Sequence, residues 1–270
     1  MSVVRLGTIE ELLAASHEHP VVRYDVGSGF VPPAWAATTA SGWAVAFPRR
    51  SDHGVPGASV LGHADALEVL LRDDRVRRWF AAGGFRHLGR PREHHDLVER
   101  LLPVGSRGGD WDWMWTTSAP PRTVGEDRVL DVGPDARDEL AALLAAESPR
   151  THGQPFARPG QRWVAVHDAD GRLLACGGAE PSAAGIPVLS GIAVVGTHRG
   201  RGLGAAVTAA LTRTAVAERG ACVLGMFADN DVARRLYRRL GFDTAVRWRS
   251  RWVEEPEQPS GERAEAPGYS

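Results

Sequence analysis

The most informative segment of this sequence is GTHRGRGLGAAV, residues 196–207. It places two arginines and three glycines within the six positions 199–204. Three interpretations fit such a composition: a disordered Arg-Gly tract that binds nucleic acid, a flexible linker, and a loop that holds an anion. The sequence on either side distinguishes among them.

An apolar run, VLSGIAVV (188–195), precedes this segment and predicts a buried strand. After it, Leu203, Val207 and Leu211 follow at helical spacing, and Gly220 is placed to end the helix. At a junction from strand to helix, backbone N–H groups and the helix N-terminus converge on an anion. Glycine lets the backbone approach phosphate oxygens, and arginine adds a charge-assisted contact. A linker needs neither neighbour, so the pattern favours a phosphate cradle.

The composition narrows the class of protein. The chain has 270 residues, is 43% hydrophobic and 24% charged, and carries a formal net charge of −1, which is typical of globular proteins. A general nucleic-acid binder needs a basic field that this chain lacks, so we predict no nucleic-acid partner. All 32 basic residues are arginine, so the lysine of a P-loop is absent. The only asparagine is Asn230.

Neither a membrane segment nor an export signal is predicted. There is no run of 18 apolar residues, and Thr8 with Glu11 reads as the capping box of a helix near the N-terminus. Cys176 and Cys222 lie far apart without metal spacing, and we expect them to be buried and reduced in a cytoplasmic protein.

No metal site is predicted either. The pairs His17 with His19 and His94 with His95 lack cysteine or carboxylate partners at ligand spacing, so surface histidines are the simpler interpretation. Cys222 is not expected to act as an acyl-relay nucleophile, because no positive neighbour in the sequence would lower its pKa.

The chain divides into two regions at the soft segment SAPPRTVGEDR (118–128). The second region predicts alternating strands and helices, with Val232, Leu236 and Leu240 on one face of the last helix. Its expected elements are a strand at 128–132, a helix from 134 to 147, a hairpin at 161–180, a strand at 188–195, a helix at 203–219, a strand at 221–227, a helix at 229–242 and a last strand near 245–252. The first region mixes helices (8–17 and 63–73) with strands (42–47 and 111–117). We therefore predict a domain over 1–120, a second over 126–252 and a disordered tail over 254–270.

The glycine-rich segment contains R-x-x-G-x-G as Arg199, Gly202 and Gly204. In this it resembles the GNAT superfamily of acyl-CoA-dependent N-acyltransferases, in which the motif wraps the pyrophosphate of coenzyme A. The segment FADNDVARRLYRRLGF (227–242) is similar to the second signature of the family, an asparagine followed by A-x-x-L-Y and G-F. The resemblance covers about residues 126–252 and implies an α/β (α+β) fold, a mixed sheet flanked by helices. One departure is Gly196, where the family often has proline.

The resemblance also implies a set of site residues. The backbone of Ile192, Ala193 and Val194 would pair with the pantetheine arm, and Asn230 would bond to the same arm while starting its helix. Tyr237 would donate to the departing thiolate, the alternative being a tyrosine packed in the core. The pyrophosphate would be held by Arg199, Gly200, Arg201, Gly202, Leu203, Gly204 and Ala205. The implied cosubstrate is acetyl-CoA, with no metal.

The implied reaction is direct attack of a neutral amine on the thioester, through a tetrahedral intermediate, with backbone N–H groups of the fourth strand polarising the carbonyl. The general base stays open among Glu180, His152 and water. The acceptor amine, the acyl chain and the oligomeric state also stay open, a homodimer being one option. A non-catalytic acyl-CoA-binding sensor is the alternative function, and Tyr237 favours catalysis because binding alone does not need it.

The first region carries no catalytic motif. Trp111, Trp113 and Trp115 alternate, so they project from one face of a strand, which favours core or a wall between domains over an acceptor pocket. DRVRRWFAAGGF (74–85) echoes NDVARRLYRRLGF (230–242), which favours a degenerate copy of the same fold over an unrelated capping domain.

Overall fold

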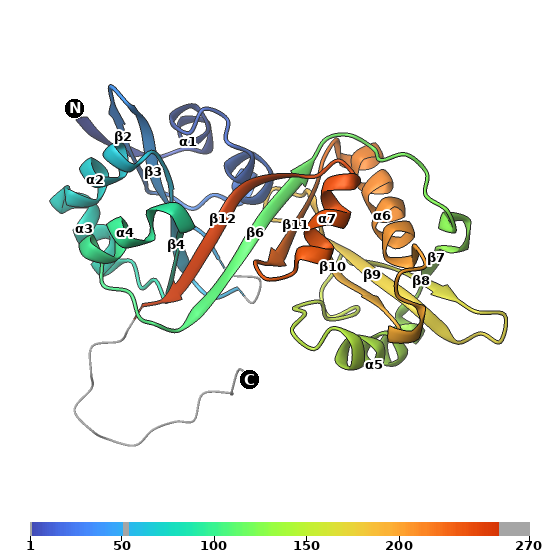
Figure 1. Cartoon of the computed structure of the whole chain (residues 1–270). Helices are drawn as coiled ribbons and strands as arrows, with labels where there is room; N and C mark the ends of the chain where they lie inside the picture. Colours follow the sequence, from blue (N-terminus) through green and yellow to red (C-terminus); the bar gives the residue numbers. More distant parts are fainter. Residues whose placement is uncertain (1, 51–53, 254–270) are drawn as a thin grey trace, which may run out of the picture.

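The computed structural model describes residues 2–50 and 54–253. They form one 12-stranded sheet in the order β1-β2-β3-β4-β5-β12-β6-β11-β10-β9-β8-β7, with helices on its faces (Figure 1). The predicted mixed sheet flanked by helices is confirmed. The predicted disordered tail, 254–270, lies outside the described residues.

The elements are close to those expected from the sequence. The strands are β1 (Ser2–Leu6), β2 (Ala34–Thr39), β3 (Gly42–Pro48), β4 (Gly57–Gly62), β5 (His87–Pro91), β6 (Gly108–Thr116), β7 (Leu130–Val132), β8 (Arg162–His167), β9 (Leu173–Pro181), β10 (Pro187–Val194), β11 (Cys222–Phe227) and β12 (Asp243–Trp252). The α-helices are α1 (Ile9–Ala15), α2 (Ala64–Arg72), α3 (Asp74–Ala82), α4 (His95–Leu101), α5 (Arg137–Glu147), α6 (Leu203–Arg219) and α7 (Asp231–Arg239). Short helical turns include η1 (Val22–Val26) and η3 (Arg92–His94).

The two halves of the chain repeat one topology. Each runs strand, helix, three strands, helix, strand, helix, strand, with α3 as the one extra helix. Neighbouring strands are antiparallel except for β4–β5 and β10–β11, which occupy equivalent places. The first half therefore has the topology of the second, as a degenerate copy requires. The sequence echo at 74–85 points to the wrong helix, however: it falls on α3, before β5, whereas α4 is the topological equivalent of α7.

The halves exchange their last strands. β6 ends the first half but pairs with β11, with Trp113 opposite Gly225. β12 ends the second half but pairs with β5, with Trp248 opposite Pro91. β6 and β12 also pair with each other at the centre of the sheet. The segment 118–128 thus connects the halves, while the sheet runs through both.

Hydrophobic cores lie on both faces of the sheet. One cluster joins β10, β11, α6 and α7 in the second half and includes Met114 of β6. Another lies under α1 and η1 and combines first-half residues with Val223, Val246 and Trp248 of the second half. Trp113 is buried in this shared cluster, and Trp111 and Trp115 pack against it. The three tryptophans therefore belong to the core that the two halves share, which is one of the two expected roles, and Trp115 stacks on Tyr24 with ring centroids 5.5 Å apart.

Several local predictions can be checked residue by residue. The Thr8 hydroxyl accepts from the Glu11 N–H, and the Glu11 carboxylate accepts from the Thr8 N–H, so the capping box is present. Gly220 ends α6 with a φ of 74°, a left-handed conformation that favours glycine. The prediction for Val232 is wrong, because it is 71% exposed. The face of α7 that packs inward instead carries Ala233, Leu236 and Tyr237.

None of the helices in the described ranges combines the length and apolarity needed to cross a bilayer.

Candidate functional site

The two central strands of the second half separate where the site begins. β10 and β11 pair at Val188–Val223 and Leu189–Leu224, and the ladder between them goes no further. On the other side of β10, the register with β9 shifts between Ser190 and Ala193. Gly191 and Ile192 thus oppose a single residue of β9, which is a β-bulge. The bulge bends β10 away from β11 and leaves one backbone edge of β10 open.

The bulge depends on a buried tryptophan. Gly191 has a φ of 62°, and a Cβ added there would lie 2.6 Å from Cη2 of Trp163. A Cβ on Gly153 would meet the same indole at 3.3 Å and the Gly191 backbone at 3.0 Å. Trp163 is 1% exposed, so it cannot move aside without disrupting the core. Glycine is required at position 191, and a side chain at position 153 would be tight against the same groups, so the loop before β8 packs closely on the bulge.

The alternation of the strand decides which backbone groups face the opening. The Val195 N–H donates to the Leu174 carbonyl of β9 at 2.9 Å, and Ala193 is in register with Cys176 of the same strand. Because successive residues of a strand point to opposite neighbours, the backbone of Ile192 and Val194 faces the open edge. Ala193, although predicted to contact the cofactor, directs its backbone to β9.

The glycine-rich segment forms a cradle of N–H groups at the start of α6. Gly200 and Gly202 have φ values of 75° and 84°, and Gly202 is the N-cap residue. The first intrahelical bond runs from the Ala206 N–H to the Gly202 carbonyl at 2.9 Å. Among the described residues, none accepts a hydrogen bond from the amides of 202–205. These donors and the helix dipole suit an anion with several oxygens.

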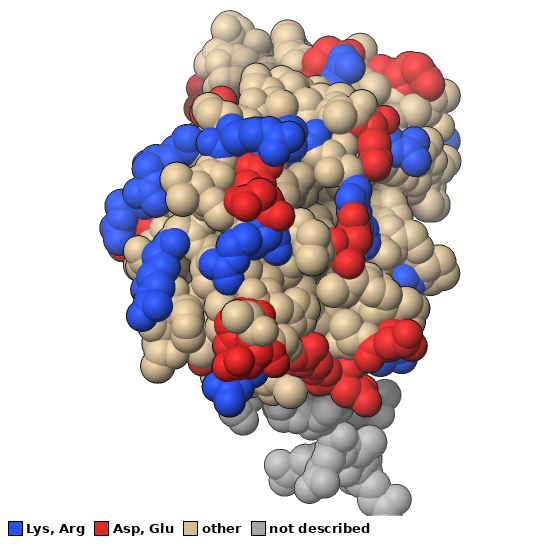
Figure 2. All heavy atoms as spheres, turned by 90° about the vertical axis from the view of Figure 1, so that its right-hand side faces the viewer, with Lys and Arg blue, Asp and Glu red and all other residues tan. Residues whose placement is uncertain are grey.

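The two arginines of the segment have different surroundings. The Arg199 guanidinium donates to the Val194 carbonyl at 3.2 Å and to the Glu147 carboxylate at 2.7 Å. Glu147, at the end of α5, also accepts from the Gly196 N–H at 2.9 Å. In this structure the Arg199 side chain ties the cradle to α5, and its expected contact with a phosphate stays a prediction. Arg201 is exposed and has no side-chain partner among the described residues. The side of the molecule that carries β7, β8 and α6 shows arginines along one border and carboxylates along its lower edge (Figure 2).

Asn230 starts α7 beside the open end of β11. Its Oδ1 accepts from the Ala233 N–H at 3.0 Å, which is an N-cap bond. The side-chain NH₂ then remains as a donor, since within the described ranges no group accepts from it. Both roles expected for Asn230 are compatible with this geometry. The neighbouring Asp229 accepts two bonds from Arg150, at 2.9 and 3.0 Å, and Arg150 lowers the pKa of this carboxyl.

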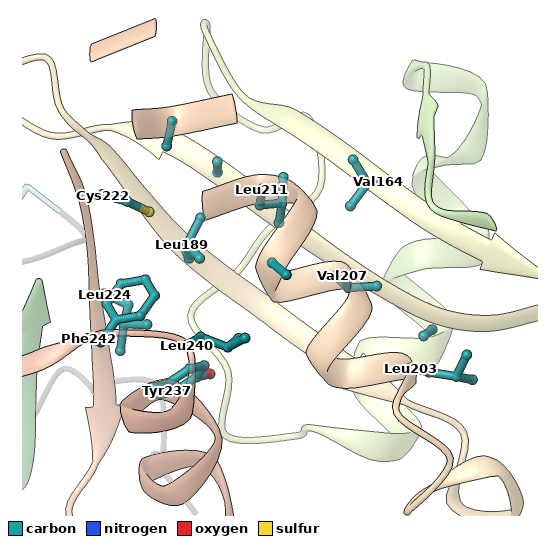
Figure 3. Close-up of a cluster of buried hydrophobic side chains, with 14 of the residues drawn as sticks. Val164, Leu189, Leu203, Val207, Leu211, Cys222, Leu224, Tyr237, Leu240 and Phe242 are labelled. Carbon is teal, nitrogen blue, oxygen red and sulfur yellow. The ribbon is translucent and has the colours of Figure 1, made fainter. Parts of the chain in front are cut away.

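Tyr237 lies on the inner face of α7, two turns after Asn230. Its ring is buried beside Leu240 and Phe242, and its hydroxyl points toward the side of the cluster on which α6 lies (Figure 3). Burial raises the pKa of the phenol to about 12. The hydroxyl therefore stays protonated at any ordinary pH and is available as a donor. The packing role and the donor role proposed from the sequence both remain consistent with this position.

The candidates for the general base differ in their surroundings. Glu180, at the end of β9, accepts from Arg158 at 2.7 Å and from the Gln161 amide at 2.9 Å. Both carboxylate oxygens of Glu180 therefore already accept a hydrogen bond. His152 lies in the loop that touches the bulge, with its ring 5.9 Å from that of Phe227 at the end of β11.

The remaining candidate residues lie elsewhere. His17 and His19 flank the ring of Trp43, and burial lowers the pKa of His19 to about 4. The Nδ1 atom of His95 donates to the Arg92 carbonyl oxygen, 2.8 Å away. Within the described ranges, no three His, Cys, Asp or Glu side chains gather as a metal site would require.

The two cysteines are free and buried. Burial raises the pKa of both Cys176 and Cys222 to about 12, so neither thiol ionises readily. Cys222 as a nucleophile is thereby disfavoured on structural grounds as well.

The first half has no equivalent cradle. There β4 ends at Gly62 and α2 begins at Ala64, with only His63 between them. That connection is too short to form a glycine-rich loop before the helix. Within residues 2–50 and 54–253, we find this combination of divergent strands and unbonded amides in the second half.

Comparison with known proteins agrees with this geometry. Residues 132–242 match the model of the family described as Acetyltransferase (GNAT) family. A GCN5-related N-acetyltransferase from Kribbella flavida is 17% identical, with 93% of this chain and 97% of that chain covered and a TM-score of 0.53. An acetyltransferase of the GNAT family from Colwellia psychrerythraea is 14% identical, with 94% and 100% covered and a TM-score of 0.50.

At these identities the solved structures show a shared fold, and they cover both halves of the chain. No curated protein sequence matches the chain. The family model falls on the half that contains the cradle, the bulge and Tyr237. Over residues 132–242 the chain therefore matches the GNAT acetyltransferase family, and the fold that it shares with the two solved structures extends over both halves.

Proposed function

We propose that this protein transfers an acetyl group from acetyl-CoA to an amine by direct attack. The observation that carries the proposal is the row of N–H groups at residues 202–205, which have no acceptor among the described residues and lie beside the open edge of β10. A diphosphate offers the oxygens that such a row can bind, and Arg201 adds a positive charge next to it.

Binding of the diphosphate at the start of α6 would determine where the rest of the cosubstrate lies. The pantetheine arm pairs with the open backbone of Ile192 and Val194, of which the Val194 carbonyl is already shared with Arg199. The NH₂ group of Asn230 donates to an amide oxygen of the same arm. This leaves the thioester between the bulge of β10 and the inner face of α7, where Tyr237 lies.

In the reaction, the nitrogen lone pair of the amine forms the C–N bond and the C–S bond breaks. The electron pair leaves with sulfur, toward which the Tyr237 hydroxyl donates. The proton lost from the amine goes to a base, for which His152 and Glu180 are the side-chain candidates, and two donors already hold the Glu180 carboxylate. Water remains the alternative to both.

A non-catalytic acyl-CoA sensor is the competing function. It shares the cradle but makes no use of a protonated phenol at the thioester. The buried Tyr237, whose pKa is raised to about 12, favours catalysis because it supplies a neutral donor at the leaving group.

The test uses the full chain with a panel of amine acceptors and detection of free thiol at saturating acetyl-CoA. Turnover with at least one amine, above hydrolysis without acceptor, supports the transferase. Tight binding of CoA with no turnover across small amines, amino sugars, aminoacyl groups and lysine peptides favours the sensor. Absence of any CoA binding by calorimetry refutes both.

A further inference from the structure

Asp112 is a buried carboxylate that joins the two halves beside the proposed cosubstrate site. It lies on β6, which belongs to the first half in sequence, and is 1% exposed. One oxygen accepts from Arg92, in the turn that follows β5. The other accepts from Nε of Arg234, on α7, at 2.9 Å. A buried carboxylate with two guanidinium partners is a strong and directional contact.

Arg234 uses its other donors at the start of the same helix. One of its terminal nitrogens donates to the Asp231 carboxylate, and the other donates to the Ala228 carbonyl. Its own N–H donates to the Asn230 carbonyl at 3.0 Å. Arg234 therefore contacts residues on both sides of Asn230 and fixes the turn between β11 and α7.

The main chain of β6 holds the same turn. The Ala228 N–H donates to the Asp110 carbonyl at 3.0 Å, next to the point where β6 and β11 stop pairing. Both polar backbone atoms of Ala228 are thus set by β6, one directly and one through Asp112 and Arg234. A strand contributed by the first half determines where α7 begins.

We propose that Asp112 is a positioning residue for the cosubstrate: through Arg234 it holds the start of α7 so that the Asn230 amide faces the pantetheine arm. The inference rests on the proposed function, since it assumes that acetyl-CoA binds here. Its physical basis is that a binding group misplaced by about 1 Å loses much of its effect. The substitution Asp112→Asn keeps the shape of the side chain but removes its negative charge, so Arg92 and Arg234 then face a neutral amide.

Asp110 provides a matched control. It lies two residues earlier on β6, on the same face, and accepts from Arg249 at 2.8 Å and Arg251 at 3.2 Å. Both partners are on β12, so this ion-pair cluster resembles that of Asp112 but does not reach α7. Asp110→Asn changes the side chain only and preserves the backbone contact to Ala228.

The experiment measures CoA affinity by calorimetry on the full chain in a double-mutant cycle. Asp112→Asn should weaken CoA about tenfold, the loss expected for one displaced charge-assisted contact. In an Asn230→Ala background the same change should cost less than about twofold, because residues that act through one another are not additive. With acetyl-CoA as substrate, KM should rise more than kcat falls.

Asp110→Asn should leave CoA affinity within about twofold of wild type. Wild-type affinity in folded Asp112→Asn overturns the proposal, and so does a full tenfold loss in the Asn230→Ala background. If Asp112→Asn does not fold, Arg234→Gln replaces it, because it breaks the link to α7 and keeps the Asp112–Arg92 pair. Failure of the wild-type chain to bind CoA refutes the proposed function instead, so the two failures are distinct.

Discussion

Trp113 lies directly opposite Gly225 in the ladder between β6 and β11, although the connecting segment 118–128 separates them in the chain. The first half thus supplies a strand to the sheet of the second, and β12 makes the reciprocal contribution beside β5. Met114 of β6 also lies in the core of the second half, where it packs with residues of α6 and α7. A second domain confined to 126–252 therefore lacks part of its own sheet and core.

This exchange predicts how fragments behave. A fragment of residues 126–253 leaves the edge of β11 unpaired and removes Met114 from the core. We therefore expect one of two outcomes: the fragment shows no cooperative unfolding transition, or it self-associates through that edge. A fragment of residues 106–253 retains β6 against both β11 and β12 and should unfold at a higher temperature. Circular dichroism melts with light scattering compare the two. A stable monomer from 126–253 with CoA affinity equal to that of the full chain would contradict the prediction.

The features that were predicted correctly from the sequence are those that depend on local patterns of residues. The glycine-rich turn, the helix from Leu203 to Gly220 and the cap at Asn230 each depend on neighbours within a few residues. The exchange of β6 and β12 was missed because alternation along a strand shows which face is buried but not which strand lies alongside. Glu147 was missed for a similar reason, since its partner Arg199 lies in another element of the fold.

The cradle predicts a selective effect at Gly202. Its φ of 84° disfavours any side chain, and a Cβ there would project into space where the nearest protein atom is 4.0 Å away. Gly202→Ala should lose about 1–2 kcal/mol of stability from backbone strain and should also lose the stabilisation by CoA. Gly171→Ala is the control, because Gly171 has a φ of 79° with no atom within 4 Å and lies in the β8–β9 turn. Differential scanning fluorimetry with and without CoA separates the two effects, and an equal CoA shift in both variants would remove Gly202 from the site.

The two arginines of the cradle should separate into a structural and a binding residue. Arg199→Gln removes the tie to Glu147, so we expect a lower melting temperature together with weaker CoA binding. Arg201→Gln removes an exposed charge without a protein partner and should leave the melting temperature unchanged. Its CoA affinity should fall severalfold, on the order of 1 kcal/mol, at low salt and less at high salt. Titration calorimetry at two ionic strengths is the measurement, and a loss of stability in Arg201→Gln would contradict this assignment.

Both thiols should be unreactive in the folded protein. Burial raises the pKa of Cys176 and of Cys222 to about 12, and the thiolate is the form that reacts. A colorimetric disulfide reagent should therefore label neither residue within the time of an assay at pH 8, and both after denaturation. This also means that thiol release from acetyl-CoA can be followed without a background from the protein. Rapid labelling of one thiol in the native state would show that its strand opens.

Tyr237 makes the sharpest prediction about the chemistry. With its pKa raised to about 12 and a thiol near 8.5, complete proton transfer to the thiolate is uphill by about 3.5 units, or about 5 kcal/mol. The phenol should therefore act as a hydrogen-bond donor to the charge that develops on sulfur. That charge exists in the transition state and not in bound acetyl-CoA, so the effect falls on turnover. We expect Tyr237→Phe to lower kcat on the order of 10²-fold, with acetyl-CoA affinity changed less than about threefold.

The pH dependence supplies an independent check on the same residue. A raised pKa keeps the hydroxyl protonated through the alkaline range, and ionisation begins only as pH approaches 12. Hence the rate profile between pH 6 and 10 should have the same shape in wild type and in Tyr237→Phe, with the variant lower throughout. Steady-state rates with a saturating amine test this once single-turnover measurements show that chemistry limits the rate. If kcat in Tyr237→Phe then equals that of wild type, Tyr237 is a packing residue and another group must stabilise the leaving thiolate.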